Sequence, residues 1–175
     1  MSSLSRETGT REAAATLLST AMGRGERRAR LPVIGGSMEP LLRSGDQVLI
    51  EPLSGSPGVG DILLFVGPRG LVCHRLVAPR GAGYVLRGDR SPTVDTVGPD
   101  ALLARVTAIQ RGERLLDLHG GLWAWRSRAI GNLAALKWSL DGRIRLPSVR
   151  RIGALFVQLA ERLLAGRLCS SLRVP

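Results

Sequence analysis

Short apolar segments separated by turn residues fill the middle of the chain, and they constrain its fold more than any other feature. Glycine, proline and aspartate recur between these segments, and these residue types favour turns. Apolar runs of this length with frequent turn signals are typical of strands joined by hairpins. The segments are residues 48–50, 62–66, 71–77, 84–86 and 102–109. The pattern predicts a mainly β fold, a small antiparallel β domain over residues 31–120.

Helical patterns flank this domain on both sides. Residues 10–22 are typical of a short amphipathic helix, and the arginine-rich stretch 24–30 is expected to be a solvated linker. After Gly120 the helical period returns. One later apolar stripe falls at i, i+3, i+4, i+7 and i+11: Ile152, Leu155, Phe156, Leu159 and Leu163. The predicted organisation is an N-terminal helix with a basic linker (1–30), the β domain (31–120) and a basic amphipathic helical tail (121–175).

The composition argues against several other classes of protein. A chain of 175 residues with 44% hydrophobic residues is long enough for one domain with a buried core. No run approaches the roughly twenty apolar residues of a membrane-spanning helix. Charged residues interrupt the N-terminal stretch, which therefore does not resemble a secretory signal, and the expected compartment is the cytoplasm. Cys73 and Cys169 are too few and too far apart for a disulfide scaffold or a metal site, and no cofactor is expected.

The net charge of +11 is concentrated at the C-terminal end of the chain. From Gly121 onward there are ten basic residues and two acidic ones, so eight of the net positive charges lie in this segment. Nucleic-acid-binding proteins share such a basic surface, but aromatic residues make up only 3% of the chain and no zinc finger or phosphate loop is present. Nucleic acid is therefore not the expected partner. A basic amphipathic tail suits an anionic membrane surface better, although such helices also pack on their own domain.

Residues that carry chemistry follow one another in order inside the predicted β domain: Ser37, His74, Asp89 and Asp95. A serine needs an adjacent base to act as a nucleophile near neutral pH, and that base needs a third group to orient it. The chain has two histidines, and its one lysine, Lys137, lies far outside this region. If a side chain activates Ser37, His74 is thus the candidate base. The residues alone leave open that Ser37 caps a turn and that His74 is a structural histidine.

The surroundings of these residues predict turns. Gly45-Asp46, Gly60-Asp61 and Gly88-Asp89 each suit a tight turn, because glycine reaches positive φ and aspartate bonds to the local backbone. Asp95 is expected in a loop that returns toward a neighbouring strand. The other histidine, His119, is expected to be a surface or structural residue.

The motifs together resemble the catalytic domain of type I signal peptidases. They resemble most closely the archaeal and endoplasmic-reticulum branch, in which histidine replaces lysine as the base. The resemblance covers residues 31–110 and rests on boxes that come in order: Ser37-Met38-Glu39-Pro40 with Gly45-Asp46, Gly60-Asp61-Ile62-Leu63-Leu64-Phe65, Cys73-His74-Arg75-Leu76-Val77 and Tyr84-Val85-Leu86-Arg87-Gly88-Asp89. Self-cleaving repressor domains of the same superfamily resemble the chain less, because they use lysine.

The resemblance implies a role for each candidate residue. Ser37 would be the nucleophile and His74 the general base, Asp95 would orient the histidine, and Asp89 would be a second carboxylate nearby. The implied activity is that of a serine endopeptidase acting on an extended peptide or a leader- or signal-type substrate, with small residues before the cleaved bond.

Two features depart from that family. Gly35 stands where many members carry a serine whose hydroxyl helps to bind the oxyanion, so backbone N–H groups are the expected donors. One lost donor lowers the rate by about a hundredfold. The N-terminal membrane anchor of such peptidases is also not expected here. Two other kinds of function therefore stay open: a non-catalytic peptide-binding module of the same fold, and a basic adaptor for a membrane surface or nucleic acid.

Overall fold

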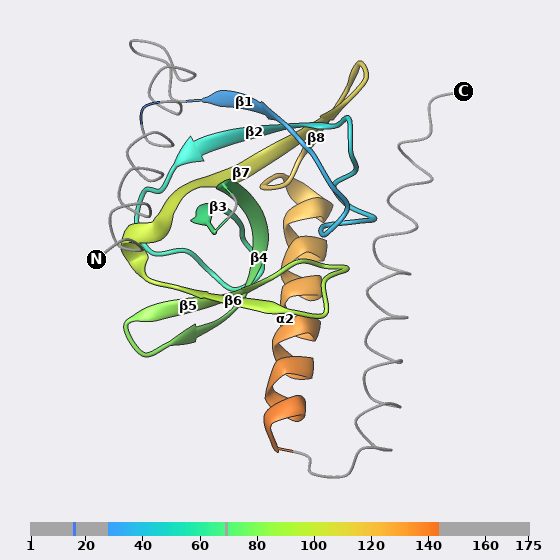
Figure 1. The fold of residues 1–175 in the computed structure, drawn as a ribbon. Coiled ribbons are helices and arrows are strands. Elements are labelled where there is room, and N and C mark those ends of the chain that lie inside the picture. The colour runs from blue at the N-terminus through green and yellow to red at the C-terminus, as the bar shows by residue number, and fades with distance from the viewer. Residues whose placement is uncertain (1–15, 17–27, 69, 144–175) are drawn as a thin grey trace.

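The computed structural model describes Thr16, residues 28–68 and residues 70–143, and the last two ranges form a curled sheet with a helix beside it (Figure 1). The strands are β1 (Ala29–Pro32), β2 (Gln47–Pro52), β3 (Ile62–Gly67), β4 (Gly70–Arg80), β5 (Gly83–Arg87), β6 (Val94–Val97), β7 (Leu102–Arg111) and β8 (Arg114–Asp117). A short 3-10 turn, η1 (Pro99–Ala101), precedes β7, and helix α2 (Gly121–Arg143) follows β8. The predicted mainly β, antiparallel fold class is confirmed.

The strands form one sheet in the order β1-β2-β7-β3-β4-β5-β6, with β8 added to the end of β7. Each pairing among the described strands is antiparallel. β7 lies between β2 and β3, so it joins the first hairpin of the chain to the later strands. β1 and β6 are the two edges of this path. Ser37 follows β1 in the chain, and Asp95 lies in β6.

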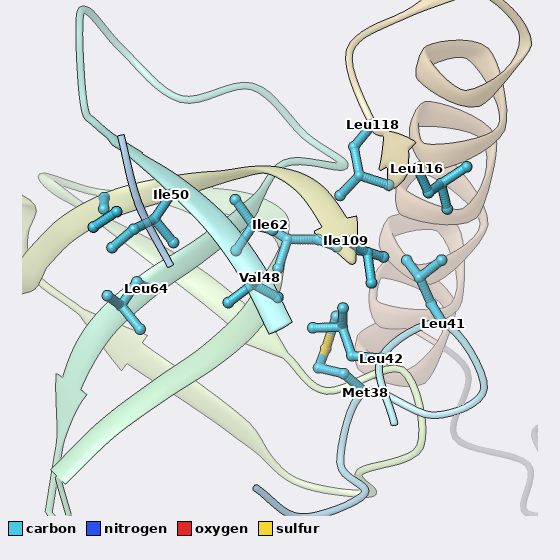
Figure 2. Close-up of a cluster of buried hydrophobic side chains, with 13 residues drawn as sticks. Met38, Leu41, Leu42, Val48, Ile50, Ile62, Leu64, Ile109, Leu116 and Leu118 are labelled. Carbon is cyan, nitrogen blue, oxygen red and sulfur yellow. The ribbon is translucent and has the colours of Figure 1, made fainter. Parts of the chain in front are cut away.

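The main hydrophobic cluster shows how the alternation of the strands builds the core (Figure 2). Side chains two residues apart on β2 and β3, such as Ile62 and Leu64, point into this cluster, whereas the intervening Leu63 joins a second cluster with Phe65. β3 is therefore buried on both faces. Met38, Leu41 and Leu42, from the connection between β1 and β2, complete the main cluster.

The structure corrects two predicted assignments and adds one strand. Residues 29 and 30 belong to β1 rather than to a solvated linker, because Ala29 packs into the main cluster. Asp95 lies in β6 rather than in a loop, since it pairs with Leu86 of β5. β8 was not predicted at all. Each of these strands is four residues long, and its pairing partner, more than its own sequence, determines that it forms.

Helix α2 packs on the sheet through small residues. Ala134 clusters with Val77 of β4 and Val85 of β5. Gly131 lies so close to Gly60 that a Cβ added at Gly131 would stand 2.3 Å from the Gly60 Cα atom. The first helix of the predicted tail therefore docks on the β domain. Apart from Thr16, the predicted helix at 10–22 lies outside the described residues, as does the apolar stripe at 152–163.

In the part of the chain that the structure describes, no helix is long and apolar enough to cross a bilayer.

We expect Gly131→Ala to lower the free energy of unfolding by about 1–3 kcal/mol, because the added methyl group forces α2 away from Gly60. Urea unfolding followed by circular dichroism measures the change. Asn132→Ala, on the exposed face of the same helix, is the matched control and should stay within about 0.5 kcal/mol of the wild type. Equal stability of the two variants would contradict the packing described above.

Candidate active site

Ser37 lies in a turn of residues 36–40, the Ser37 turn, in the connection from β1 to β2. The turn is anchored on its core side, because Met38 is buried directly after the serine. Arg111 holds the same connection from β7: its guanidinium donates to the Leu41 carbonyl at 3.0 Å and pairs with the buried carboxylate of Asp46. The Ser37 side chain itself is exposed. The Ser37 hydroxyl is therefore accessible, while buried residues hold the turn that carries it in place.

His74 comes from β4 and contacts the serine directly. Its Nε2 atom lies 3.2 Å from the Ser37 Oγ atom, and its Nδ1 atom lies 2.7 Å from Oδ2 of Asp95. The imidazole is buried and packs against the ring of Phe65, with centroids 5.9 Å apart. Because an ionised carboxylate only accepts hydrogen bonds, Asp95 holds the proton on Nδ1. Nε2 of the neutral ring is then free to accept the hydroxyl proton of Ser37.

Asp95 reaches His74 because of the register of two strand pairs. β6 pairs with β5 so that Asp95 lies opposite Leu86, and β5 pairs with β4 so that Leu86 lies opposite Leu76. His74 and Leu76 are two residues apart and share a face of the sheet. The Asp95 side chain therefore lies on the same face of the sheet as the His74 imidazole. It comes from β6, and β5 separates β6 from β4.

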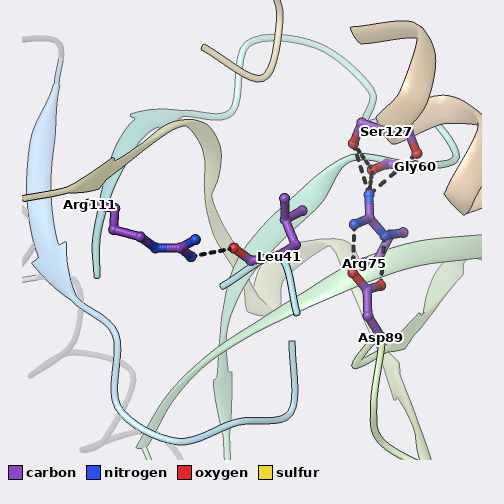
Figure 3. A network of polar contacts seen from close by, with 6 residues as sticks. All are labelled: Leu41, Gly60, Arg75, Asp89, Arg111 and Ser127. Atoms are coloured by element: carbon purple, nitrogen blue, oxygen red, sulfur yellow. Dashed lines mark hydrogen bonds and ion pairs between the residues drawn. The ribbon is translucent and has the colours of Figure 1, made fainter. Parts of the chain in front are cut away.

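Asp89 is not brought to the histidine. Its carboxylate accepts two hydrogen bonds from Arg75, at 2.8 Å from Nε and at 2.7 Å from Nη2 (Figure 3). Arg75 is fully buried and follows His74 directly, so the alternation of β4 places the two side chains on opposite faces. Of the four predicted site residues, Ser37, His74 and Asp95 gather in one place. Asp89 neutralises a buried cation instead.

Residues 88–91, the Gly88 segment, lie against both partners of the serine-histidine pair. A Cβ added at Gly88 would stand 2.6 Å from the Ser37 carbonyl oxygen and 2.9 Å from Nε2 of His74. Arg90 fastens the segment further, because its backbone N–H donates to the same Ser37 carbonyl at 2.8 Å and its guanidinium contacts the Glu39 carboxylate.

The reason for glycine at position 88 differs from the predicted one. Gly45 and Gly60 adopt the positive φ expected of their turns, at 91° and 99°, but Gly88 does not. Its lack of a side chain matters because the backbone passes so close to the imidazole. Sequence pattern alone does not distinguish these two uses of glycine.

We expect Gly88→Ala to slow the reaction of Ser37 with a serine-reactive phosphonate probe by about a hundredfold, because the methyl group displaces the imidazole from the hydroxyl. Gly98→Ala is the matched control, since a Cβ there would meet nothing within 4 Å. Labelling rates and melting temperatures are measured together. A Gly88→Ala protein that reacts at the wild-type rate would show that the close approach is unimportant.

The backbone N–H of Ser37 is an available donor. No backbone hydrogen bond among the described turns engages it, and Gly35, with φ of 93°, presents no side chain next to it. An N–H group at the nucleophile itself is well placed to stabilise an oxyanion.

The remaining candidates lie away from this site. Cys73 packs against the main cluster on the face opposite His74, and burial raises the pKa of its thiol to about 12, so it is not a thiolate near neutral pH. Cys169 lies outside the described residues. His119 is exposed beyond β8, where its backbone N–H donates to Asp117. Among residues 28–68 and 70–143, no three His, Cys, Asp or Glu side chains are grouped to hold a metal ion.

Two residues near the site carry no clear sequence signal. Arg75 directly follows the candidate base, but nothing in its surroundings predicts that it is fully buried. Ser127, on α2, contacts Arg75 from 52 positions further along the chain. Only the folded structure reveals that contact.

Neither a scan against protein-family models nor a search of the curated proteins gives a match to this chain.

Proposed function

We propose that this chain is a serine endopeptidase in which Ser37 is the nucleophile, His74 the general base and Asp95 the group that orients the base. The observation that carries the proposal is the unbroken series from Asp95 Oδ2 to His74 Nδ1, at 2.7 Å, and from His74 Nε2 to Ser37 Oγ, at 3.2 Å. A buried imidazole between an acceptor-only carboxylate and an exposed hydroxyl is the arrangement that activates serine.

The mechanism follows from the hydrogen-bond order. Ser37 Oγ attacks the carbonyl carbon of the cleaved bond while its proton passes to Nε2 of His74, and the imidazolium then gives that proton to the leaving amine. A water molecule then attacks the acyl carbon while His74 takes its proton, and the imidazolium returns that proton to Ser37 Oγ as the acyl group leaves. Asp95 keeps the ring in the Nδ1–H tautomer and stabilises the imidazolium, without taking the proton itself.

The oxyanion of the tetrahedral intermediate would accept a hydrogen bond from the Ser37 N–H. Gly35 supplies no hydroxyl as a second donor, and the loss of one such donor costs about a hundredfold in rate. Slow turnover is therefore part of the proposal.

An unpaired stretch of strand edge next to His74 favours a peptide as the substrate. β4 pairs with β3 from Gly70 onward, whereas its pairing with β5 begins only at Arg75. Among the described strands, nothing else pairs with the first half of β4, which leads to the base. An extended peptide added to such an edge satisfies its own backbone groups. Leu71 on this stretch and Ile34 before the Ser37 turn both expose apolar side chains, which suit an apolar peptide such as a leader.

A peptide library incubated with the full chain tests the proposal, with products identified by mass spectrometry. We expect cleavage at internal bonds and covalent labelling of Ser37 by a phosphonate probe. Peptide binding without cleavage or labelling would instead favour the non-catalytic peptide-binding module. Contact of the basic tail (residues 121–175) with an anionic membrane surface stays a second proposal, alongside the docking of one face of α2 on the sheet.

A further inference from the structure

Arg75 is the centre of a polar network that joins three parts of the fold (Figure 3). Its Nε and Nη2 atoms hold the carboxylate of Asp89, while Nη1 donates to the Gly60 carbonyl at 2.9 Å. Nη1 also donates to Ser127, whose hydroxyl lies at 2.8 Å and whose backbone carbonyl lies at 3.4 Å. The Ser127 hydroxyl in turn donates to the same Gly60 carbonyl at 3.2 Å. The guanidinium is fully buried, so each of these acceptors replaces water.

One end of this network touches the proposed catalytic residues. Asp89 follows Gly88, whose backbone lies against His74 Nε2 and the Ser37 carbonyl. The position of Asp89 therefore affects where the Gly88 segment lies, and the Gly88 segment limits where the imidazole can stand relative to the hydroxyl.

The other end is set by helix α2. Ser127 lies one turn before Gly131, the residue in backbone contact with Gly60, and Ile130 between them is buried. Because backbone contacts between glycines leave little freedom to slide, α2 presents the Ser127 hydroxyl to Arg75 in a defined place.

We infer that Ser127 is a positioning residue of the active site, acting through Arg75 and Asp89 on the Gly88 segment. Without the hydroxyl, Nη1 keeps the Gly60 carbonyl at 2.9 Å and is drawn toward the Ser127 backbone carbonyl, which lies at 3.4 Å. Because the guanidinium is planar and rigid, this movement turns Nε and Nη2 relative to Asp89. The inference rests on the proposed function, and it extends the catalytic unit beyond residues 31–110 to include α2.

The test compares four full-length proteins: the wild type, Ser127→Ala, Ser127→Thr and Asn132→Ala. The rate of Ser37 labelling by a phosphonate probe is measured from pH 5 to pH 9. We expect Ser127→Ala to lower the plateau rate about tenfold through misplacement of the imidazole. Ser127→Thr keeps a hydroxyl and should recover the rate to within about twofold. Asn132→Ala, on the exposed face of α2, should match the wild type.

A second readout reports on the histidine without requiring catalysis. The chain has two histidines, so in a His119→Gln background the imidazole signals in nitrogen-15 NMR spectra belong to His74 alone. Ser127→Ala should shift these signals, and Ser127→Thr should restore them.

The outcomes separate the two claims. A wild type that never reacts at Ser37 would refute the peptidase proposal, and the NMR signals would then still decide the positioning role. Unchanged His74 signals in Ser127→Ala would overturn the inference, as would a wild-type labelling rate or a loss that Ser127→Thr does not recover. A shift of the signals with rescue by threonine supports it.

Discussion

Ser37→Ala should abolish peptide hydrolysis and probe labelling while the protein stays folded. The substitution removes one oxygen from an exposed side chain, in a turn that Met38 and Leu41 anchor in the core. The free energy of unfolding should therefore change little. Loss of the nucleophile of a hydrolase triad lowers turnover by about a millionfold. Cleavage of a peptide found in the library screen gives the rate, and thermal unfolding followed by circular dichroism checks the fold.

The same logic extends to the base. His74→Ala should lower turnover by about as much as Ser37→Ala, because the two residues act as a unit. Ser44→Ala, an exposed serine in the same β1–β2 connection, and His119→Ala are the controls, and both should keep wild-type turnover. Near-normal turnover of His74→Ala would refute the proposed mechanism.

The two carboxylates should respond to substitution in opposite ways. Asp95→Asn removes control of the His74 tautomer and should lower turnover by about ten-thousandfold with little change in stability, since the Asp95 side chain is 35% exposed. Asp89→Asn leaves Arg75, whose side chain is 0% exposed, without its counter-charge. That variant should lose about 3–5 kcal/mol of folding free energy.

Turnover and urea unfolding, measured on both variants, distinguish the two effects. Asp100→Asn is the control, because this aspartate is exposed in the 3-10 turn before β7. A destabilised Asp95→Asn protein beside a stable, inactive Asp89→Asn protein would reverse the assignment of the two carboxylates.

Local pattern in the sequence was sufficient for much of the fold. The strands with the longest apolar runs, β3, β4 and β7, were predicted because their side chains carry their own signal: enough apolar residues to be buried, bounded by turn residues. The return of the helical period after Gly120 likewise predicted the start of α2. The short strands β1, β6 and β8 were missed or misplaced, because a partner strand stabilises them more than their own composition does.

The sequence also determined which residues could form the site but not how they are arranged. The scarcity of histidine and lysine identified His74 as the candidate base for Ser37. Two aspartates six positions apart were both candidates to orient it, and the register of β6 on β5 placed Asp95, not Asp89, at the imidazole.

The tertiary structure alone decided what Asp89 and Ser127 do. Both bind Arg75, one from the turn after β5 and the other from a helix 52 positions away. Such contacts depend on how a sheet curls and where a helix docks, which are set by packing summed over many residues. A local pattern of residue types records which side chains can be buried or bonded, but not which distant partner they will meet.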